Sequence, residues 1–379
     1  MEPYQHIFQL AKWHNLNQIH EFPYTKWQMP ENEIIYRVEF ADMQRDHKSR
    51  PQRHLTYAVT TPRRSFNTMQ SSRLHLPLRL FLLAMAAMSL DATAIEGGQP
   101  ITPFGVFEFG TGMLPPPSDL PAVGFRAAHF SANRLNDNAG NRAPGSADLT
   151  INSYAVSFVK MTNATLLGGR YGWAVVVPYF DMNANFRGIP TPVGPMNVSG
   201  SPKALADVEV LPVILGWQPT DNFFVNTSLA LQVPVGSYDK NRQVNPGANH
   251  WTISPTLAFT YITPFGSEIS SNIQINFHTR NNATDYRSGM EYQHDFGVGQ
   301  HIGSWTVGLG GYFSQQFTDD IQAGQAIGNR ARVLAAGPAI QFFKPGSGLP
   351  LVTLHAYKEL ASKNRVQGHQ IAMKLGWTF

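Results

Sequence analysis

The sequence predicts an all-β protein, a twelve-stranded antiparallel transmembrane β-barrel of the outer-membrane type. Three observations support this fold class: a closing strand of alternating polarity, a series of twelve strand-like runs, and the composition. Only 14% of the 379 residues are charged, whereas 12% are aromatic, which suits a barrel whose outer face meets lipid. An unpaired backbone group is costly in hydrocarbon, so a sheet in a membrane needs closure.

The closing strand is the stretch 370–379, which reads Q-I-A-M-K-L-G-W-T-F. Every second residue is large and apolar, which is the period of a strand with one face in lipid and one in water. A last strand that ends in Phe resembles the C-terminal strand of bacterial outer-membrane barrels. The resemblance implies that Trp377 and Phe379 form an assembly signal and that the barrel-assembly machinery is a partner. The alternative for this stretch alone is an edge strand of a soluble sandwich.

The first part of the chain differs from the rest. Residues 1–68 are rich in His, Gln, Asn and charge and lack sustained periodicity, so we expect a disordered upstream extension. Residues 69–94 have the order of a secretory signal peptide, with two arginines, an apolar run at 80–90 and Ala92-Thr93-Ala94 as a cleavage site. Translation is then expected to begin at Met69. The alternative is a genuine N-terminal domain with an internal signal anchor.

Residues 95–121 form a Gly- and Pro-rich segment ahead of the barrel. Its three successive prolines, Pro115-Pro116-Pro117, cannot lie within a hydrogen-bonded strand. We expect this segment to lie on the periplasmic side or inside the lumen.

Residues 122–379 form the predicted barrel. Strand-like runs alternate with turn clusters, and each run is long enough for a tilted spanning strand. Even-numbered connections are short, whereas the odd-numbered connections 135–147, 185–204, 236–248 and 318–329 are longer and polar, the pattern of periplasmic turns and extracellular loops. The runs are 122–134, 148–160, 168–184, 205–218, 222–235, 249–263, 267–280, 286–298, 304–317, 330–344, 350–360 and 366–379.

Alternation within the runs predicts which side chains face the lumen. In 267–278, Ile269, Ile273 and Phe277 share one face, and polar residues share the other. These inward faces are too polar for a soluble sandwich, because a sandwich would have to bury them in its hydrophobic core. Charges in a lumen set pore selectivity or brace the wall. Their positions in this alternation assign eight ionisable residues to the lumen and substrate pathway: Glu268, His278, Arg287, Glu291, Asp295, His355, Glu359 and Lys374.

No pattern indicates catalysis. Walker, Rossmann, H-E-x-x-H and G-x-S-x-G motifs are absent, and without cysteine thiolate metal sites and thiol catalysis are excluded. Asp319-Asp320 is a candidate cation pair, but a solvated turn is the simpler interpretation. We therefore expect no enzyme, no cofactor and no metal. Residues 95–379 carry nearly equal numbers of cationic and acidic side chains, so no nucleic-acid partner is indicated.

Several stretches resemble one family, the outer-membrane barrels linked to the MetA pathway of phenol degradation. These include 206–217, 234–239, 246–251, 281–289 and 364–368. The resemblance implies a channel in the cell outer membrane of a Gram-negative bacterium, with membrane lipid and small aromatic or hydrophobic solutes as partners. Passive admission of phenol-type compounds is the implied function. The alternative is a structural or surface-binding barrel with a plugged lumen.

Overall fold

The computed structural model describes residues 103–191 and 194–378. The predictions for residues 1–68, for the signal peptide 69–94 and for Phe379 lie outside this part of the chain, and stay predictions. Within it, no helix is long and apolar enough to cross a bilayer.

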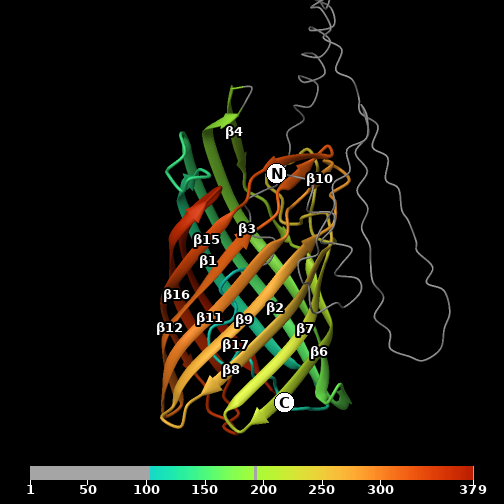
Figure 1. Ribbon diagram of the computed structural model, residues 1–379, viewed down its shortest axis with the longest axis vertical. Coiled ribbons are helices and arrows are strands. Elements are labelled where there is room, and N and C mark those ends of the chain that lie inside the picture. Colours follow the sequence, from blue (N-terminus) through green and yellow to red (C-terminus); the bar gives the residue numbers. More distant parts are fainter. Residues whose placement is uncertain (1–102, 192–193, 379) are drawn as a thin grey trace, which may run out of the picture. The chain divides into compact units, whose positions relative to one another are not determined.

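Twelve antiparallel strands form a closed barrel, as predicted (Figure 1). The wall strands are β1 (Ala122–Asn136), β2 (Ser146–Leu166), β3 (Gly169–Thr191), β6 (Val208–Thr220), β7 (Phe223–Val233), β8 (Thr252–Ile262), β9 (Ser267–His278), β11 (Glu291–Ile302), β12 (Trp305–Gln316), β15 (Arg332–Phe342), β16 (Leu351–Lys363) and β17 (Arg365–Trp377).

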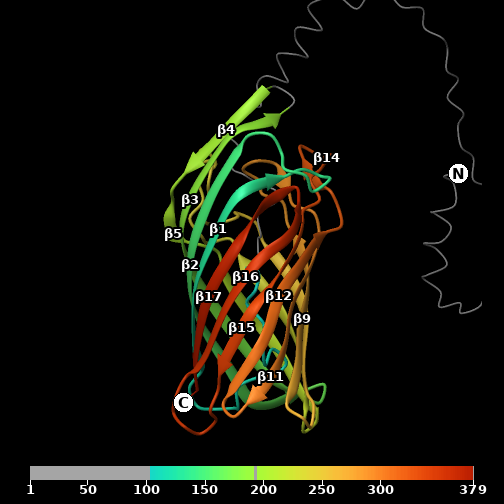
Figure 2. The same ribbon diagram turned by 90° about the vertical axis from the view of Figure 1, so that its left-hand side faces the viewer.

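The last strand closes the sheet against the first. β17 pairs with β1 from Val123 opposite Trp377 to Asn136 opposite Arg365, and its other edge pairs with β16. Figure 2 shows β17 beside β1 and β16. Because every strand of the wall has two neighbours, no row of backbone donors and acceptors is left to face lipid.

The two faces of the wall have the polarity of a membrane barrel. On β8, Ile253 and Leu257 are exposed outward, whereas Thr252 and Thr260 are completely buried inside. The same alternation continues on β9, where the inward row from Glu268 to His278 is polar and buried. Large apolar side chains that are exposed on a strand surface require lipid rather than water.

The extracellular end is more ordered than the sequence suggests. The prediction of a loop over residues 185–204 is largely wrong, because β3 continues to Thr191 and pairs with β4 (Gly194–Gly200) and β5 (Lys203–Leu205). Figure 1 shows this extension rising beyond the rest of the wall. Pairing continues here because Phe186 and Val198 pack with Met182 and Val244 in one apolar cluster.

The predicted run 286–298 is interrupted. β11 begins only at Glu291, and Tyr286–Arg287 form β10, which pairs with β13 (Asp320–Gln322) in a separate three-stranded sheet with β14 (Gln325–Gly328). The Tyr286 hydroxyl donates a hydrogen bond to the buried Asp320 carboxylate, and this contact draws the segment out of the wall. Arg287 is exposed on β10, so its assignment to the lumen wall is corrected.

Turn lengths follow the predicted alternation with one exception. Leu167-Gly168 and Asp221-Asn222 join neighbouring strands at one end, and residues 234–251 form a long connection at the other. The connection between β16 and β17 belongs to the long-loop end, yet it consists of Asn364 alone, with a φ of 51°. Asn tolerates this left-handed conformation better than most residues do.

Candidate functional site

The lumen is occupied by the segment that precedes β1. We call residues 103–114 the lumen segment, because their backbone is hydrogen-bonded to inward side chains of the wall. Asn226 on β7 donates to the Thr111 carbonyl at 2.9 Å, and Gln293 on β11 donates to the Pro103 carbonyl at 3.1 Å. A segment without regular structure needs such partners, since its peptide groups would otherwise be buried unpaired.

Asp295 on β11 anchors the middle of the lumen segment. Its carboxylate accepts hydrogen bonds from the backbone N–H groups of Gly105, Val106 and Phe107, at 3.3, 2.9 and 3.2 Å. The side chain is completely buried. Several charge-assisted hydrogen bonds on one buried carboxylate form a strong and specific attachment.

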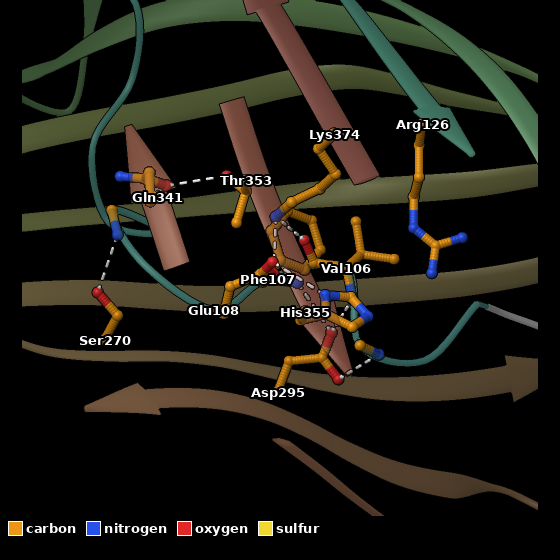
Figure 3. A network of polar contacts seen from close by, with 12 residues as sticks. Val106, Phe107, Glu108, Arg126, Ser270, Asp295, Gln341, Thr353, His355 and Lys374 are labelled. Atoms are coloured by element: carbon orange, nitrogen blue, oxygen red, sulfur yellow. Dashed lines mark hydrogen bonds and ion pairs between the residues drawn. The ribbon is translucent and has the colours of Figure 1, made fainter. Parts of the chain in front are cut away.

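Glu108 connects the lumen segment to the last two strands. Its carboxylate accepts a hydrogen bond from Lys374 Nζ at 2.7 Å, and His355 Nδ1 lies 3.0 Å from its second oxygen. Lys374 also donates to the Val106 carbonyl. Figure 3 shows Lys374, His355 and Glu108 converging, with Asp295 facing the same stretch of chain.

Two further wall strands hold the segment's second half. Glu268 on β9 accepts the Gly110 N–H at 2.7 Å, and Thr260 on β8 accepts the Gly112 N–H at 2.9 Å. Gly112 lies so close to β8 that an added Cβ would collide with its backbone. Phe104 stacks on Tyr312 of β12, with ring centroids 5.1 Å apart. The segment is thus fixed by polar and apolar contacts around much of the wall.

A cavity of about 670 Å³ lies between the lumen segment and the extracellular loop 234–251. The wall beside it is chemically divided. β1, β2, β3 and β6 contribute mainly apolar side chains, whereas β7 to β9 contribute amides and hydroxyls. The apolar residues of the first wall include Phe130, Leu149, Ile151, Val159, Val176, Phe180, Met182, Leu211 and Ile214. This volume is in the range of small-molecule sites.

The loop 234–251 is folded inward and anchored by a buried carboxylate. Asp207, ahead of β6, accepts the backbone N–H groups of Gly236 at 2.8 Å and Ala248 at 2.7 Å. Burial raises the pKa of Asp207, although these two hydrogen bonds oppose the shift. Val244 from the same loop is buried in the apolar cluster at the barrel mouth. The loop therefore covers the cavity from the extracellular side.

The sequence-predicted lumen residues fall into separate groups. Asp295, Glu268, His355 and Lys374 lie together around the lumen segment, as described above. Glu359 lies elsewhere, between Arg365 and Tyr312, where it accepts hydrogen bonds at 3.0 and 2.9 Å.

The remaining predicted residues lie toward the extracellular end. His278 Nε2 is 3.8 Å from a Glu291 carboxylate oxygen, and His278 Nδ1 is 3.0 Å from the Thr252 hydroxyl. Arg287 is in neither group, because it belongs to β10 outside the wall.

Sequence reasoning missed several residues of the site, namely Glu108, Arg126, Asp207 and Glu209. Glu108 was detectable in principle, because it is the only charged residue in the stretch P-F-G-V-F-E-F-G at 103–110. Arg126 lies two residues from Gly124 and from Ala128 and so shares their face of β1, which lines the cavity. Asp320, interpreted as a solvated turn residue, is instead completely buried and holds the extracellular sheet together.

Replacing Asp295 by Asn is expected to loosen the lumen segment. An amide cannot accept three N–H bonds as a carboxylate does, and each lost bond that leaves a buried donor unpaired costs roughly 1–3 kcal/mol. Backbone amide exchange at Gly105, Val106 and Phe107 should accelerate by at least an order of magnitude, since about 1.4 kcal/mol is tenfold. Asp319→Asn, on the extracellular surface, is the control. Unchanged exchange in Asp295→Asn would contradict this role.

Acid is expected to open the loop 234–251. Burial, then the neighbouring His278, lower the pKa of His250 from 6.5 to about 4. The packed loop keeps His250 neutral, whereas in the open loop the exposed imidazole is protonated below about pH 6.5. The packed loop therefore becomes less stable than the open one as the pH drops from about 6.5 toward 4. Hydrogen exchange of the loop should rise through this window. His250→Gln should lose this dependence, and an identical profile in that variant would refute the prediction.

Comparison with known proteins gives a consistent relationship. The family of the MetA pathway of phenol degradation matches residues 132–375. An outer-membrane channel of Pseudomonas putida F1 is similar in structure, with a TM-score of 0.60 and 13% identity over 72% of this chain and 100% of that one. The β domain of the Bordetella autotransporter BrkA matches with a TM-score of 0.39 and 13% identity, over 68% and 100% of the two chains. No curated protein matches.

The family match and the likeness to the Pseudomonas putida channel agree with the closed wall and the apolar outer face of the barrel. At 13% identity the structural likeness concerns the fold, and that fold is the one of Gram-negative outer-membrane channels. The exposed apolar outer face and the closed wall make the protein an outer-membrane barrel, as the sequence predicts. Because the family match covers more than half of the chain, this protein belongs to the outer-membrane barrel family linked to the MetA pathway of phenol degradation.

Proposed function

We propose that the protein is an outer-membrane channel that passively admits small hydrophobic or aromatic compounds of the phenol type. The observation that carries this proposal is the lumenal cavity of about 670 Å³ with its apolar wall on β1, β2, β3 and β6. Such a wall offers hydrophilic solutes few hydrogen-bond partners, whereas an aromatic ring gains free energy when it leaves water to contact the wall. Family membership supports the same solute class.

Passage requires two movements. The loop 234–251 covers the cavity on the extracellular side, and the lumen segment closes it below. Both are attached chiefly through buried carboxylates, Asp207 for the loop and Asp295 and Glu268 for the segment. Hydrogen bonds of this kind are made and broken locally without disturbing the strand ladder, so the wall stays closed while either element moves. No step in this path needs a catalytic group.

Uptake of a labelled phenolic compound by a deletion strain tests the proposal. Expression of the wild-type chain should restore uptake at low solute concentration. Ala155→Trp fills the cavity from β2 and should abolish the restored uptake. Val156→Trp changes the neighbouring, lipid-facing residue and is the matched control. Equal uptake with and without the protein, or with both tryptophan variants, would count against transport.

A second function is favoured by one observation, the lumen segment itself. Its many wall contacts suit a structural or surface-binding barrel that keeps a plugged lumen and acts through its extracellular loops. Single-channel recording with added phenolic solutes discriminates between the two, because a permanently plugged barrel gives no solute-dependent current. The proposed partners are outer-membrane lipid and the barrel-assembly machinery, the latter through Trp377 and Phe379.

A further inference from the structure

Arg126 is a half-buried cation whose guanidinium has unused hydrogen-bonding capacity. It projects from β1 into the cavity, next to Lys374 on the paired strand. Its Nη1 contacts the Ser153 hydroxyl at 3.3 Å and its Nη2 contacts the Phe104 carbonyl at 3.4 Å. Both distances are long, and its buried Nε has no partner within the described residues. A guanidinium carries five N–H donors in total.

The neighbouring carboxylates already have other hydrogen-bond partners. Glu108 and Asp295 act on Arg126 through space, but Glu108 is bound to Lys374 and His355. Asp295 accepts the three backbone N–H groups of the lumen segment. In Figure 3 Arg126 extends beside this network, and no dashed line joins it to the residues drawn. Partial removal of a guanidinium from water without a hydrogen-bonded counter-ion is costly, so this arrangement is explained if a ligand supplies the anion.

The surroundings define what kind of anion fits. The cavity that contains Arg126 is lined on the same side by Phe130, Ile151 and Leu211. A ligand there needs an apolar body for this wall and one acidic group for the guanidinium. Carboxylates match the planar fork of arginine best, because they accept two parallel N–H bonds.

We propose that Arg126 binds the carboxylate of small aromatic or alkyl monocarboxylic acids inside the cavity, and so sets the channel's preference among hydrophobic solutes. This inference rests on the proposed function, which it narrows. Glu209 on β6 lines the same cavity and makes no hydrogen bond or ion pair within the part of the chain that the structure describes. Its carboxyl group offers a second ligand carboxylate no cationic partner, so monoacids are preferred over diacids.

The test compares benzoate with benzyl alcohol, which has a similar shape and no charge. Binding of each is measured calorimetrically to the full chain in lipid nanodiscs, with empty nanodiscs subtracted. The wild-type protein should bind benzoate more tightly than benzyl alcohol. Arg126→Gln should weaken the binding of benzoate on the order of tenfold or more, as expected for loss of a charge-assisted pair. The affinity for benzyl alcohol should stay unchanged. Arg126→Lys should fall between the two.

Matched controls separate this inference from the proposed function. Arg134 lies on the same strand but does not line the cavity, so Arg134→Gln should bind benzoate like the wild type. Heat-modifiable gel mobility establishes that each variant is folded, and Arg126→Lys decides the question if Arg126→Gln does not fold. Equal binding of benzoate and benzyl alcohol by the wild type overturns the role of Arg126 but not the admission of aromatics. Failure of both ligands to bind overturns both proposals.

Discussion

Deletion of residues 103–114 will raise the single-channel conductance of the purified barrel several-fold while the barrel itself stays folded. The lumen segment contacts inward residues from β7 through β17, so its removal joins the cavity to the periplasmic side. The barrel is expected to survive because the strand ladder makes no use of this segment. Asp295 and Glu268 lose their amide partners, but water that enters the lumen hydrates both carboxylates.

The measurement is conductance in planar bilayers, and heat-modifiable mobility reports folding. As a control, Pro115, Pro116 and Pro117 are replaced by serine, which leaves residues 103–114 and their wall contacts in place and should keep conductance low. A deletion variant that is folded yet conducts like the wild type would show that the barrier lies elsewhere, with the loop 234–251 as the next candidate.

Replacement of Glu359 by Ala will destabilise the barrel by roughly 3–5 kcal/mol, the usual cost of removing one partner from a buried ion pair. Glu359 accepts hydrogen bonds from Arg365 Nη2, the Tyr312 hydroxyl and the Gly368 N–H, at 3.0, 2.9 and 2.7 Å. Glu359 is 1% exposed, and Arg365 is 4% exposed. Removal therefore leaves a buried guanidinium, a hydroxyl and an amide without their acceptor.

Urea titration of folded protein in lipid vesicles measures this loss. Glu359→Gln keeps the shape and one acceptor oxygen, so an intermediate loss is expected. Leu360→Ala, which alters the adjacent outward residue with 58% exposure, is the control and should have a smaller effect. If Glu359→Ala matched Leu360→Ala, the buried pair would have no net role in holding β12, β16 and β17 together.

The barrel wall could be predicted because its rules are local. Period-two alternation shows which residues face lipid, and turn clusters mark where strands end. Such signals located all twelve wall strands, including the pairing of β17 with β1. They failed at Arg287, where a hydrogen bond to Asp320 from the next loop redirects the chain. They also failed at 185–204, where Val244 of the loop 234–251 contributes to the cluster that supports the longer strand.

The candidate site was less predictable. Parity alone placed Glu268, Asp295, His355 and Lys374 among the inward residues, but it could not show that they bind one segment. The hydrogen bond from Gly105 to Asp295 joins residues 190 positions apart, and that from Lys374 to Val106 joins residues 268 apart. Nothing in the sequence near either end encodes such a contact.

By itself, the sequence determined the fold class, the strand number and the polarity of each face, because a strand in a membrane must satisfy its backbone through neighbours and turn alternate side chains to lipid. Only the tertiary structure decided that residues 103–114 occupy the lumen, that a cavity remains above them, and that Arg126 has no hydrogen-bonded counter-ion among the described residues. These features depend on which side chains meet across a closed barrel, and closure brings together residues that no local pattern relates.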